Sequence, residues 1–356
     1  MQPINACGQY FVAVGQPLEE RQFTIESVAD DQVVVQVAGC GLCHTDLGFI
    51  NGGVKPKFEL PLILGHEISG TVVAAGGQYT SLVGKNVIVP AVLPCGECEL
   101  CRAGRDNICQ RQLMPGNDFH GGFASHVSVP ARFLSQLPDD LGGFELSPLS
   151  VIADAITTPY QSLIRSGLKA GDLAIVIGVG GVGLYMVQHA KIAGATVIAL
   201  EIDEAKLKSA GEQGADFCIC TRDMDEREIK KQIKDLVKEH NLPRNQWRVF
   251  ENSGSAAGQS TAFSLLTYAG TVGIVGFTMD KVNVRLSNIM AFDADVFGNW
   301  GCRPEYYSNV IDYVLTKKIN LLDNIVQYPL SEINAVVAEA FAHRLTKRAI
   351  LVPDHN

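Results

Sequence analysis

Between residues 172 and 299 the sequence alternates apolar runs with helix-like segments. The helix-like segments include "VGLYMVQHAKIAG" and "MDEREIKKQIKDLVKEH". The apolar runs are "DLAIVIG", "ATVIALEI", "ADFCIC", "WRVFEN", "GTVGIVGF" and, last, "DADVFGN". Nearly all-apolar strands that alternate with helices are typical of a parallel sheet covered on both faces. The pattern therefore predicts an α/β domain with a doubly wound sheet of six parallel strands.

A glycine-rich turn follows the first of these strands. Gly178, Gly180 and Gly183 stand between an apolar run and a helix-like segment, with Gly181 and Val182 completing the turn. In a dinucleotide-binding turn the first glycine makes the bend, the second admits the pyrophosphate to the backbone, and the third lets helix and strand pack closely. We expect a dinucleotide to bind here.

The second strand ends on an acidic residue, Glu201. A carboxylate at this position accepts hydrogen bonds from the adenosine ribose and repels a 2′-phosphate, which predicts NAD rather than NADP. The alternative is that Glu201 only ends the strand in solvent. We expect Asp203 to cap the next helix, and Lys206 in that helix is a further candidate cofactor contact.

Residues 1–150 have a different pattern, with short β-type runs broken by glycine. Runs such as "DQVVVQVAGCG", "ISGTVVAAGG" and "GKNVIVPAVL" predict a small, partly open β-barrel. Beyond the sheet domain, "EYYSNVIDYVLTKK" and "EINAVVAEAFAHRL" predict two amphipathic helices. A chain of 356 residues is long enough for two domains.

The composition and the first residues indicate which classes of binding partner and which cellular compartment to expect. The chain is 47% hydrophobic and 19% charged, and no apolar stretch has the length that a membrane span needs. A net charge of -9 disfavours nucleic acid as the partner. The start, "MQPINACGQYFVAVGQPLEE", lacks the pattern of a secretory signal, so we expect a cytoplasmic protein without membrane partners.

Four cysteines are concentrated in the stretch "PCGECELCRAGRDNIC". In a reducing compartment such a cluster binds metal more often than it forms disulfides. Four thiolates close a tetrahedron around zinc and leave no position for a substrate, which predicts a structural site. Reduced surface cysteines and an iron–sulfur cluster are the alternatives. The expected ligands are Cys95, Cys98, Cys101 and Cys109.

Two stretches of the expected barrel carry further zinc-preferring side chains. "AGCGLCHTDLGF" contains Cys43, and "PLILGHEISGTV" contains His66 followed by Glu67. From the residues alone, Cys40 and Cys43 are also compatible with a redox pair or with buried positions in a core.

In order along the chain, "CGLCHTD", "GHE", the four cysteines, "TTPYQSL" and "GVGGVG" resemble the zinc-dependent medium-chain alcohol dehydrogenases. The resemblance covers essentially the whole chain. It implies a GroES-like catalytic domain at 1–154 with a zinc lobe at 94–110, a Rossmann NAD-binding domain at 155–297, and a return at 298–356 that completes the catalytic domain. It also implies catalysis between the domains, one catalytic and one structural zinc, and a homo-oligomer, a tetramer or a dimer.

The same resemblance assigns roles around the catalytic zinc. Cys43 and His66 become ligands, and Asp46 holds His66 in place. Glu67 lies beside the metal as a transient fourth ligand, and Thr45 bonds the substrate oxygen and starts a proton relay.

Two positions depart from the family pattern. The third ligand, a cysteine in many relatives, is Asp154, a harder donor with the charge of a thiolate. Alternatively Asp154 caps a helix and Glu67 completes the metal sphere, or the metal is weak or absent. A relay histidine of many relatives is Gly48, so the relay would end in water or at His44, also a candidate cofactor contact. Thr158 matches a position that contacts the nicotinamide.

Within the family, "MPGNDFHGGFASH" and Asp154 resemble the 6-hydroxycyclohex-1-ene-1-carbonyl-CoA dehydrogenases of anaerobic benzoyl-CoA degradation. This implies a cyclic allylic alcohol that carries a CoA thioester. Basic residues that could meet the CoA phosphates, or else lie solvated at the surface, are Lys55, Lys57, Arg303 and Lys317.

The alternatives are another zinc alcohol or polyol dehydrogenase, a metal-free NADPH reductase, or a catalytically silent zinc-stapled NAD-binding protein. His120 and His126 could line the cleft, but we expect both, like His189, to be structural. The segment "TVGIVGF" is a candidate edge strand for oligomer contacts.

Overall fold

The computed structural model describes residues 2–354, which fall into two compact units. The barrel unit is Met1–Thr157 with Gly301–Asn356, and the sheet unit is Thr158–Trp300. These boundaries lie three residues later than the expected ones at 154 and 297. Residues 298–300 belong with the sheet unit because the Gln161 side chain donates to the Asn299 side chain at 3.3 Å and to the Trp300 carbonyl at 3.4 Å.

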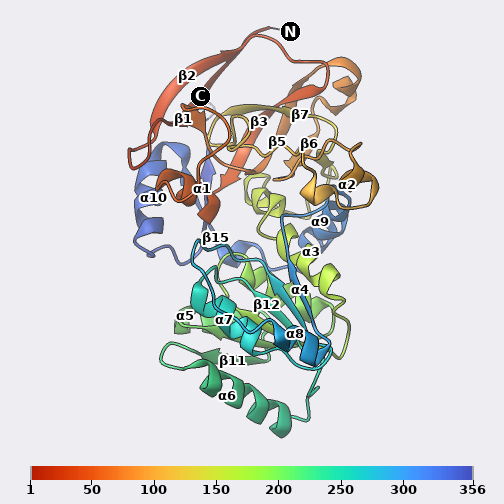
Figure 1. Cartoon of the computed structure of the whole chain (residues 1–356). Coiled ribbons are helices and arrows are strands. Elements are labelled where there is room, and N and C mark those ends of the chain that lie inside the picture. Colours follow the sequence, from red (N-terminus) through yellow and green to blue (C-terminus); the bar gives the residue numbers. More distant parts are fainter. Residues whose placement is uncertain (1, 355–356) are drawn as a thin grey trace. The chain divides into compact units, whose positions relative to one another are not determined.

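The sheet unit contains the six parallel strands that the apolar runs predict (Figure 1). Their order across the sheet is β11-β10-β9-β12-β13-β14, so the chain runs outward from β9 in both directions. The strands are β9 (Leu173–Ile177), β10 (Thr196–Glu201), β11 (Phe217–Cys220), β12 (Arg248–Glu251), β13 (Thr271–Ile274) and β14 (Asp295–Gly298). The prediction of an edge strand in "TVGIVGF" was wrong, because β13 lies between β12 and β14, and the edge strands are β11 and β14.

Helices pack on both faces of this sheet. Ile175 of β9 belongs to one buried cluster, whereas its neighbours Ala174 and Val176 belong to another on the opposite face. This alternation explains why the strands are apolar throughout. The helices are α3 (Thr157–Ser166), α4 (Gly183–Ile192), α5 (Glu204–Glu212), α6 (Glu226–Glu239), α7 (Ala256–Ser264) and α8 (Ser287–Phe292).

The barrel unit has a three-stranded sheet, β2-β1-β4, and a seven-stranded sheet. The C-terminal strands β15 and β16 join the larger sheet through the pairing of β16 with β3, which makes the C-terminal return part of this unit. The strands are β1 (Ile4–Phe11), β2 (Glu19–Ile25), β3 (Gln32–Gly41), β4 (Leu62–Ile63), β5 (Glu67–Ala75), β6 (Asn86–Val89), β7 (His126–Pro130), β8 (Ser135–Gln136), β15 (Ile325–Pro329) and β16 (Arg348–Val352).

The barrel unit also contains short α-helices and 3-10 helices. The two expected amphipathic helices form as α9 and α10. Each is shorter than its sequence pattern, because a 3-10 turn takes its first residues and the helix ends three or four residues before the pattern does. The α-helices are α1 (His44–Ile50), α2 (Glu99–Arg102), α9 (Tyr307–Leu315) and α10 (Ile333–Phe341). The 3-10 helices are η1 (Gly77–Leu82), η2 (Asp106–Ile108), η3 (Ser147–Ala153), η4 (Pro304–Tyr306), η5 (Leu322–Asn324) and η6 (Leu330–Glu332). Among the described residues, no helix combines the length and the apolar character needed to cross a bilayer.

Candidate metal and cofactor sites

The four cysteines of the zinc lobe converge on one point. Their sulfur atoms lie 3.5 Å apart for Cys98 and Cys101, 3.5 Å for Cys95 and Cys109, 3.7 Å for Cys98 and Cys109, and 3.9 Å for Cys95 and Cys101. A tetrahedron with Zn–S bonds of about 2.3 Å has edges of about 3.8 Å. The sulfur positions therefore fit a closed tetrahedral zinc site, and they surround no open ligand position.

The protonation of these thiols also fits a cation. Hydrogen bonding by the Glu97 backbone lowers the pKa of Cys95 to about 6. Burial raises the pKa of Cys101 to about 12. Because the four thiols differ in this way, a bound cation is needed to hold all of them as thiolates at neutral pH.

A second group of ligand atoms, the Cys43 cluster, forms in the barrel unit. It consists of Cys43, His66, Glu67 and Asp154, whose ligand atoms all lie within 4.8 Å of one another. Cys43 is the N-cap of α1, and Asp154 is the C-cap of η3. His66 immediately precedes β5, and Glu67 is the first residue of that strand. His66 Nε2 lies 3.6 Å from Asp154 Oδ2. Thr45 Oγ1 lies 3.8 Å from Cys43 Sγ, at the exposed side of α1.

Asp46 holds the cluster together from behind. Its carboxylate is fully buried and accepts the backbone N–H of Cys43 at 2.9 Å and of Gly65 at 3.1 Å. His66 Nδ1 lies 3.4 Å from Asp46 Oδ1, which turns Nε2 toward Asp154. One aspartate thus connects the two loops that carry Cys43 and His66.

The charge around His66 tests whether a metal fits. Burial opposes a protonated imidazole, yet Asp46, Cys43 and Asp154 together raise the pKa of His66 well above its usual value. Buried anionic groups are destabilising unless a positive charge neutralises them. A divalent cation bound by these atoms would supply that positive charge. Its ligands would be one thiolate, one imidazole and one carboxylate, a donor set that zinc accepts.

Glu67 pairs with Arg348, a partner that no local sequence pattern predicted. Arg348, the first residue of β16, donates Nε to Glu67 Oε2 at 2.7 Å and its Nη2 to Oε1, and the Ala155 N–H also donates to Oε1 at 3.1 Å. Both charged side chains are buried. The two residues are 281 positions apart, so the only signal was the need of a buried carboxylate for a cation.

Cys40 does not join the Cys43 cluster. Both residues are free thiols. Cys40 is fully buried in the barrel core, where its sulfur lies beneath Gly65 and Gly122.

The glycine turn of the sheet unit has the local geometry that the motif predicts. Gly178 has φ +78°, and a Cβ there would lie 2.6 Å from the backbone of Ser253. A Cβ on Gly183, the first residue of α4, would lie 1.8 Å from the Gly178 carbonyl oxygen, whereas a Cβ on Gly180 would meet no atom within 4 Å. Gly181 is exposed and Val182 is the N-cap of α4. Two glycines are therefore required by packing, and the middle one faces open space.

Glu201 ends β10 beside this turn. Its carboxylate accepts the Val179 N–H at 3.0 Å and the Ile202 N–H at 2.8 Å. Asp203 caps α5, as expected, by accepting from the N–H groups of Ala205 and Lys206. The acidic side chain is thus held at the glycine turn.

The remaining candidate cofactor contacts are Thr158, His44 and Lys206. Thr158 is buried near the start of α3, and its carbonyl accepts from the Asn299 side chain at 3.2 Å. His44 is exposed at the first position of α1. Lys206 is half-buried in α5.

Several residues from the sequence analysis have structural partners. Lys57 pairs with Asp118 at 3.0 Å, and Arg303 pairs with Asp106 at 2.7 Å. These ion pairs occupy two of the basic groups that were candidates for CoA phosphates.

The three histidines expected to be structural are packed in the fold. His120 accepts a backbone hydrogen bond from Ile63, His126 lies 3.1 Å from the Ser125 hydroxyl, and His189 is buried in α4.

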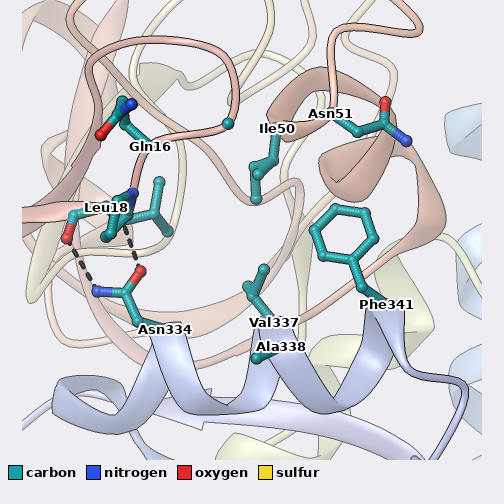
Figure 2. Close-up of a pocket in the computed structure, with 10 residues that line it drawn as sticks. Gln16, Leu18, Ile50, Asn51, Asn334, Val337, Ala338 and Phe341 are labelled. Carbon is teal, nitrogen blue, oxygen red and sulfur yellow. Dashed lines mark hydrogen bonds between the residues drawn. The ribbon is translucent and has the colours of Figure 1, made fainter.

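A pocket of about 450 Å³ lies at the other end of α1 from Cys43 (Figure 2). Ile50, Val337 and Phe341 form its apolar side, and the Asn334 amide closes one wall by pairing with the backbone N–H and C=O of Leu18. None of the Cys43 cluster residues lines this pocket.

Comparisons with known proteins match both units. An alcohol dehydrogenase GroES-like domain matches residues 29–139, and a zinc-binding dehydrogenase domain matches residues 181–316. A sorbitol dehydrogenase from Halalkalibacterium halodurans is 30% identical over 310 residues, covering 85% of this chain and 86% of that protein. The chain belongs to the zinc-dependent medium-chain alcohol dehydrogenase family. As a member of this dehydrogenase family it is an oxidoreductase that acts on CH–OH donors.

Two further relatives extend the match to nearly the full length. An alcohol dehydrogenase from Geobacillus stearothermophilus is 29% identical over 337 residues, covering 94% of this chain and 95% of that protein. The crystal structure of an alcohol dehydrogenase from the archaeon Aeropyrum pernix superposes with a TM-score of 0.86 at 27% identity, covering 98% and 100% of the two chains. The expected GroES-like and Rossmann architecture is confirmed.

Proposed function

We propose that this dehydrogenase oxidises a secondary alcohol with NAD, using zinc held by Cys43, His66 and Asp154. The observation that carries the proposal is the Cys43 cluster itself, in which a thiol, an imidazole and two carboxylates meet within 4.8 Å. Arg348 and the Ala155 N–H engage Glu67, which favours Asp154 as the third ligand. When bound, zinc supplies a Lewis acid that lowers the pKa of an alcohol hydroxyl.

The residues around the cluster divide the remaining work. The Thr45 hydroxyl, at the exposed start of α1, accepts the proton of the substrate hydroxyl and passes it on. Asp46 keeps the His66 ring in one orientation, because it is tied to the backbone of both ligand loops. Gly48 carries no side chain that could extend the relay, so we propose that the proton leaves Thr45 to water or to the exposed His44.

The cofactor preference follows from Glu201. Its carboxylate stands at the carboxyl end of β10 and is oriented by the Val179 N–H of the glycine turn. We propose that it accepts the adenosine ribose hydroxyls and disfavours a 2′-phosphate by charge repulsion. The nicotinamide ring accepts the hydride, and Thr158, His44 and Lys206 remain candidate contacts of the dinucleotide.

For the substrate class, we propose a cyclic allylic alcohol that carries a CoA thioester, oxidised to the 6-oxo compound. The support is the resemblance of residues 114–126, together with Asp154, to 6-hydroxycyclohex-1-ene-1-carbonyl-CoA dehydrogenases. A second candidate is a simple alcohol or a polyol, which the named alcohol and sorbitol dehydrogenase relatives favour.

Steady-state assays of NADH formation separate these candidates. Purified enzyme is offered the CoA ester, free cyclohexenol, simple secondary alcohols and polyols at matched concentrations. The proposal expects kcat/KM for the CoA ester to exceed the others. Equal or higher values for a polyol would favour the second candidate.

Metal analysis tests the zinc assignment independently of the substrate. The proposal expects two zinc ions per chain, and Cys43→Ser is expected to lose one of them together with turnover. Binding of NAD is expected to survive this change, since the glycine turn lies in the sheet unit. A variant that keeps both turnover and metal would contradict the assignment, and a single zinc in the unmodified protein would favour a silent, zinc-stapled chain.

We also propose that the chain forms a homo-oligomer through the edge of the sheet unit. β14 is an edge strand, and such strands tend to pair with another chain. The segment before it leaves apolar side chains 67–78% exposed, namely Phe277, Met279, Leu286 and Met290. Light scattering is expected to report a dimer or tetramer, and Val296→Lys on β14 is expected to shift the population toward monomer.

A further inference from the structure

Residues 62–65 reach the Cys43 cluster from β4 and end immediately before His66. A second segment, the 114–123 loop ("MPGNDFHGGF"), lies against them. The Gly121 N–H donates to the Ile63 carbonyl at 2.7 Å, the Phe123 N–H to Leu64 at 3.0 Å, and the Gly122 N–H to Gly65 at 2.8 Å. The 114–123 loop therefore holds the carbonyl groups of three consecutive residues before His66.

The close approach of the two segments depends on glycine. A Cβ on Gly121 would lie 2.2 Å from the Gly65 carbonyl oxygen, and a Cβ on Gly116 would lie 2.7 Å from the Gly65 nitrogen. Gly116 has φ +73° and Gly65 has φ +95°, so neither position suits another residue. The two segments thus contact each other backbone to backbone. This contact restricts the position of the backbone immediately before His66.

Two side chains satisfy N–H groups of the same short segment. Asp46 accepts the Gly65 N–H at 3.1 Å and faces His66. At the other end, His120 Nδ1 accepts the Ile63 N–H at 3.2 Å. Since a buried N–H without a partner is costly, both acceptors are needed to keep this segment in one conformation.

The surroundings of His120 suit an acceptor role. Its ring packs edge-on against Tyr10 at 5.6 Å and tilted against Phe58 at 5.2 Å between ring centroids. Burial lowers the pKa of His120, so the ring stays neutral at physiological pH. A neutral ring that accepts at Nδ1 carries its hydrogen on Nε2.

We propose that His120 is a positioning residue for the metal ligand His66, acting through its hydrogen bond from the Ile63 N–H and the backbone of residues 63–65. The inference rests on the proposed zinc site, because His66 is placed for a metal only if one binds there. His120 itself touches none of the Cys43 cluster residues through any described contact, so its effect is indirect.

Three variants separate the hydrogen bond from the packing. His120→Asn keeps an acceptor, since Asn Oδ1 is the same number of bonds from the backbone as His Nδ1. His120→Leu fills similar space without an acceptor. Phe58→Leu is the matched control, because it removes a ring contact to His120 and leaves the hydrogen bond in place.

Two readouts are measured on the intact enzyme, neither of them activity. The first is hydrogen exchange of the peptide that contains residues 62–65, before and after chelation. The second is the rate at which each zinc transfers to a chromogenic chelator, with the four-cysteine site as the internal standard. Loss of the acceptor is expected to speed both exchange and release of the second zinc about tenfold in His120→Leu. His120→Asn and Phe58→Leu are expected to stay within about twofold of the unmodified enzyme.

Either of two results would overturn the inference. One is a folded His120→Leu variant with unchanged exchange and zinc release, and the other is a His120→Asn variant as impaired as His120→Leu. If the unmodified enzyme itself binds only the four-cysteine zinc, the proposed function fails first. That outcome is distinguishable, because it appears before any variant is made.

Discussion

Replacing Arg348 by methionine is the most direct test of how the Cys43 cluster is supported. The change removes both guanidinium hydrogen bonds to Glu67 and leaves a fully buried carboxylate with the Ala155 N–H. Breaking one partner of a buried ion pair costs about 3–5 kcal/mol. In a domain of about 150–250 residues each kcal/mol moves the Tm by about 2–4 °C, so the expected fall is about 6–20 °C.

The loss of stability in Arg348→Met is expected to depend on pH. Burial raises the pKa of Glu67 above its usual value, and Arg348 opposes that rise. Without Arg348 the folded-state pKa increases further above the unfolded value. The folded protein then binds more protons than the unfolded chain, so stability falls as pH rises from the unfolded pKa toward the folded pKa. The loss of Tm in Arg348→Met is therefore expected to be larger at pH 8 than at pH 5, by scanning calorimetry at equal zinc content.

The matched control is the double variant Glu67→Gln with Arg348→Met. It has no buried charge at this position, so it is expected to regain more than half of the lost Tm. An Arg348→Met variant whose Tm lies within about 2 °C of that of the unmodified enzyme would contradict the expected cost of the unpaired carboxylate. A double variant no more stable than the single one would refute it equally.

Five other substitutions, at four positions, have defined outcomes. Asp154→Ala is expected to lose one of two zinc ions and more than a hundredfold in kcat/KM, whereas Asp154→Cys is expected to keep the metal; metal analysis and NADH formation check both. Gly180→Ala is expected to leave the Tm unchanged, because its Cβ would enter open space. The same Cβ would lie where the pyrophosphate approaches the backbone, so calorimetric titration is expected to show NAD binding weakened at least tenfold. Gly183→Ala, whose Cβ clashes with the Gly178 carbonyl, is expected to lower the Tm as well. Glu201→Ala is expected to lower the ratio of kcat/KM for NAD over NADP at least tenfold, and an unchanged ratio would show that the carboxylate does not select the cofactor.

Structural features that depend on neighbouring residues could be predicted from the sequence. The six strands, the glycine turn and the Asp203 cap depend on residues close together in the chain, and all appear in the structure. The four cysteines span 15 residues, so a short loop can bring their sulfurs together. The ligand role of Asp154 stays a prediction, although its carboxylate does meet His66.

Other features were decided by long-range packing. The edge position of β14, rather than β13, follows from the order in which the strands assemble. The residue that neutralises Glu67 arrives with β16, after the chain has passed through the sheet unit and returned. His120 and Ile63 likewise meet only because the 114–123 loop packs against β4.

Spacing of a few residues sets turns, caps and short metal loops, so the amino-acid sequence already specifies the chemical groups and the local structure of each segment. The pairing of buried charges is visible only in the folded chain, because the residue that neutralises a carboxylate in a core can come from any position in the sequence. For Glu67 that partner is 281 residues away, beyond the reach of any local pattern.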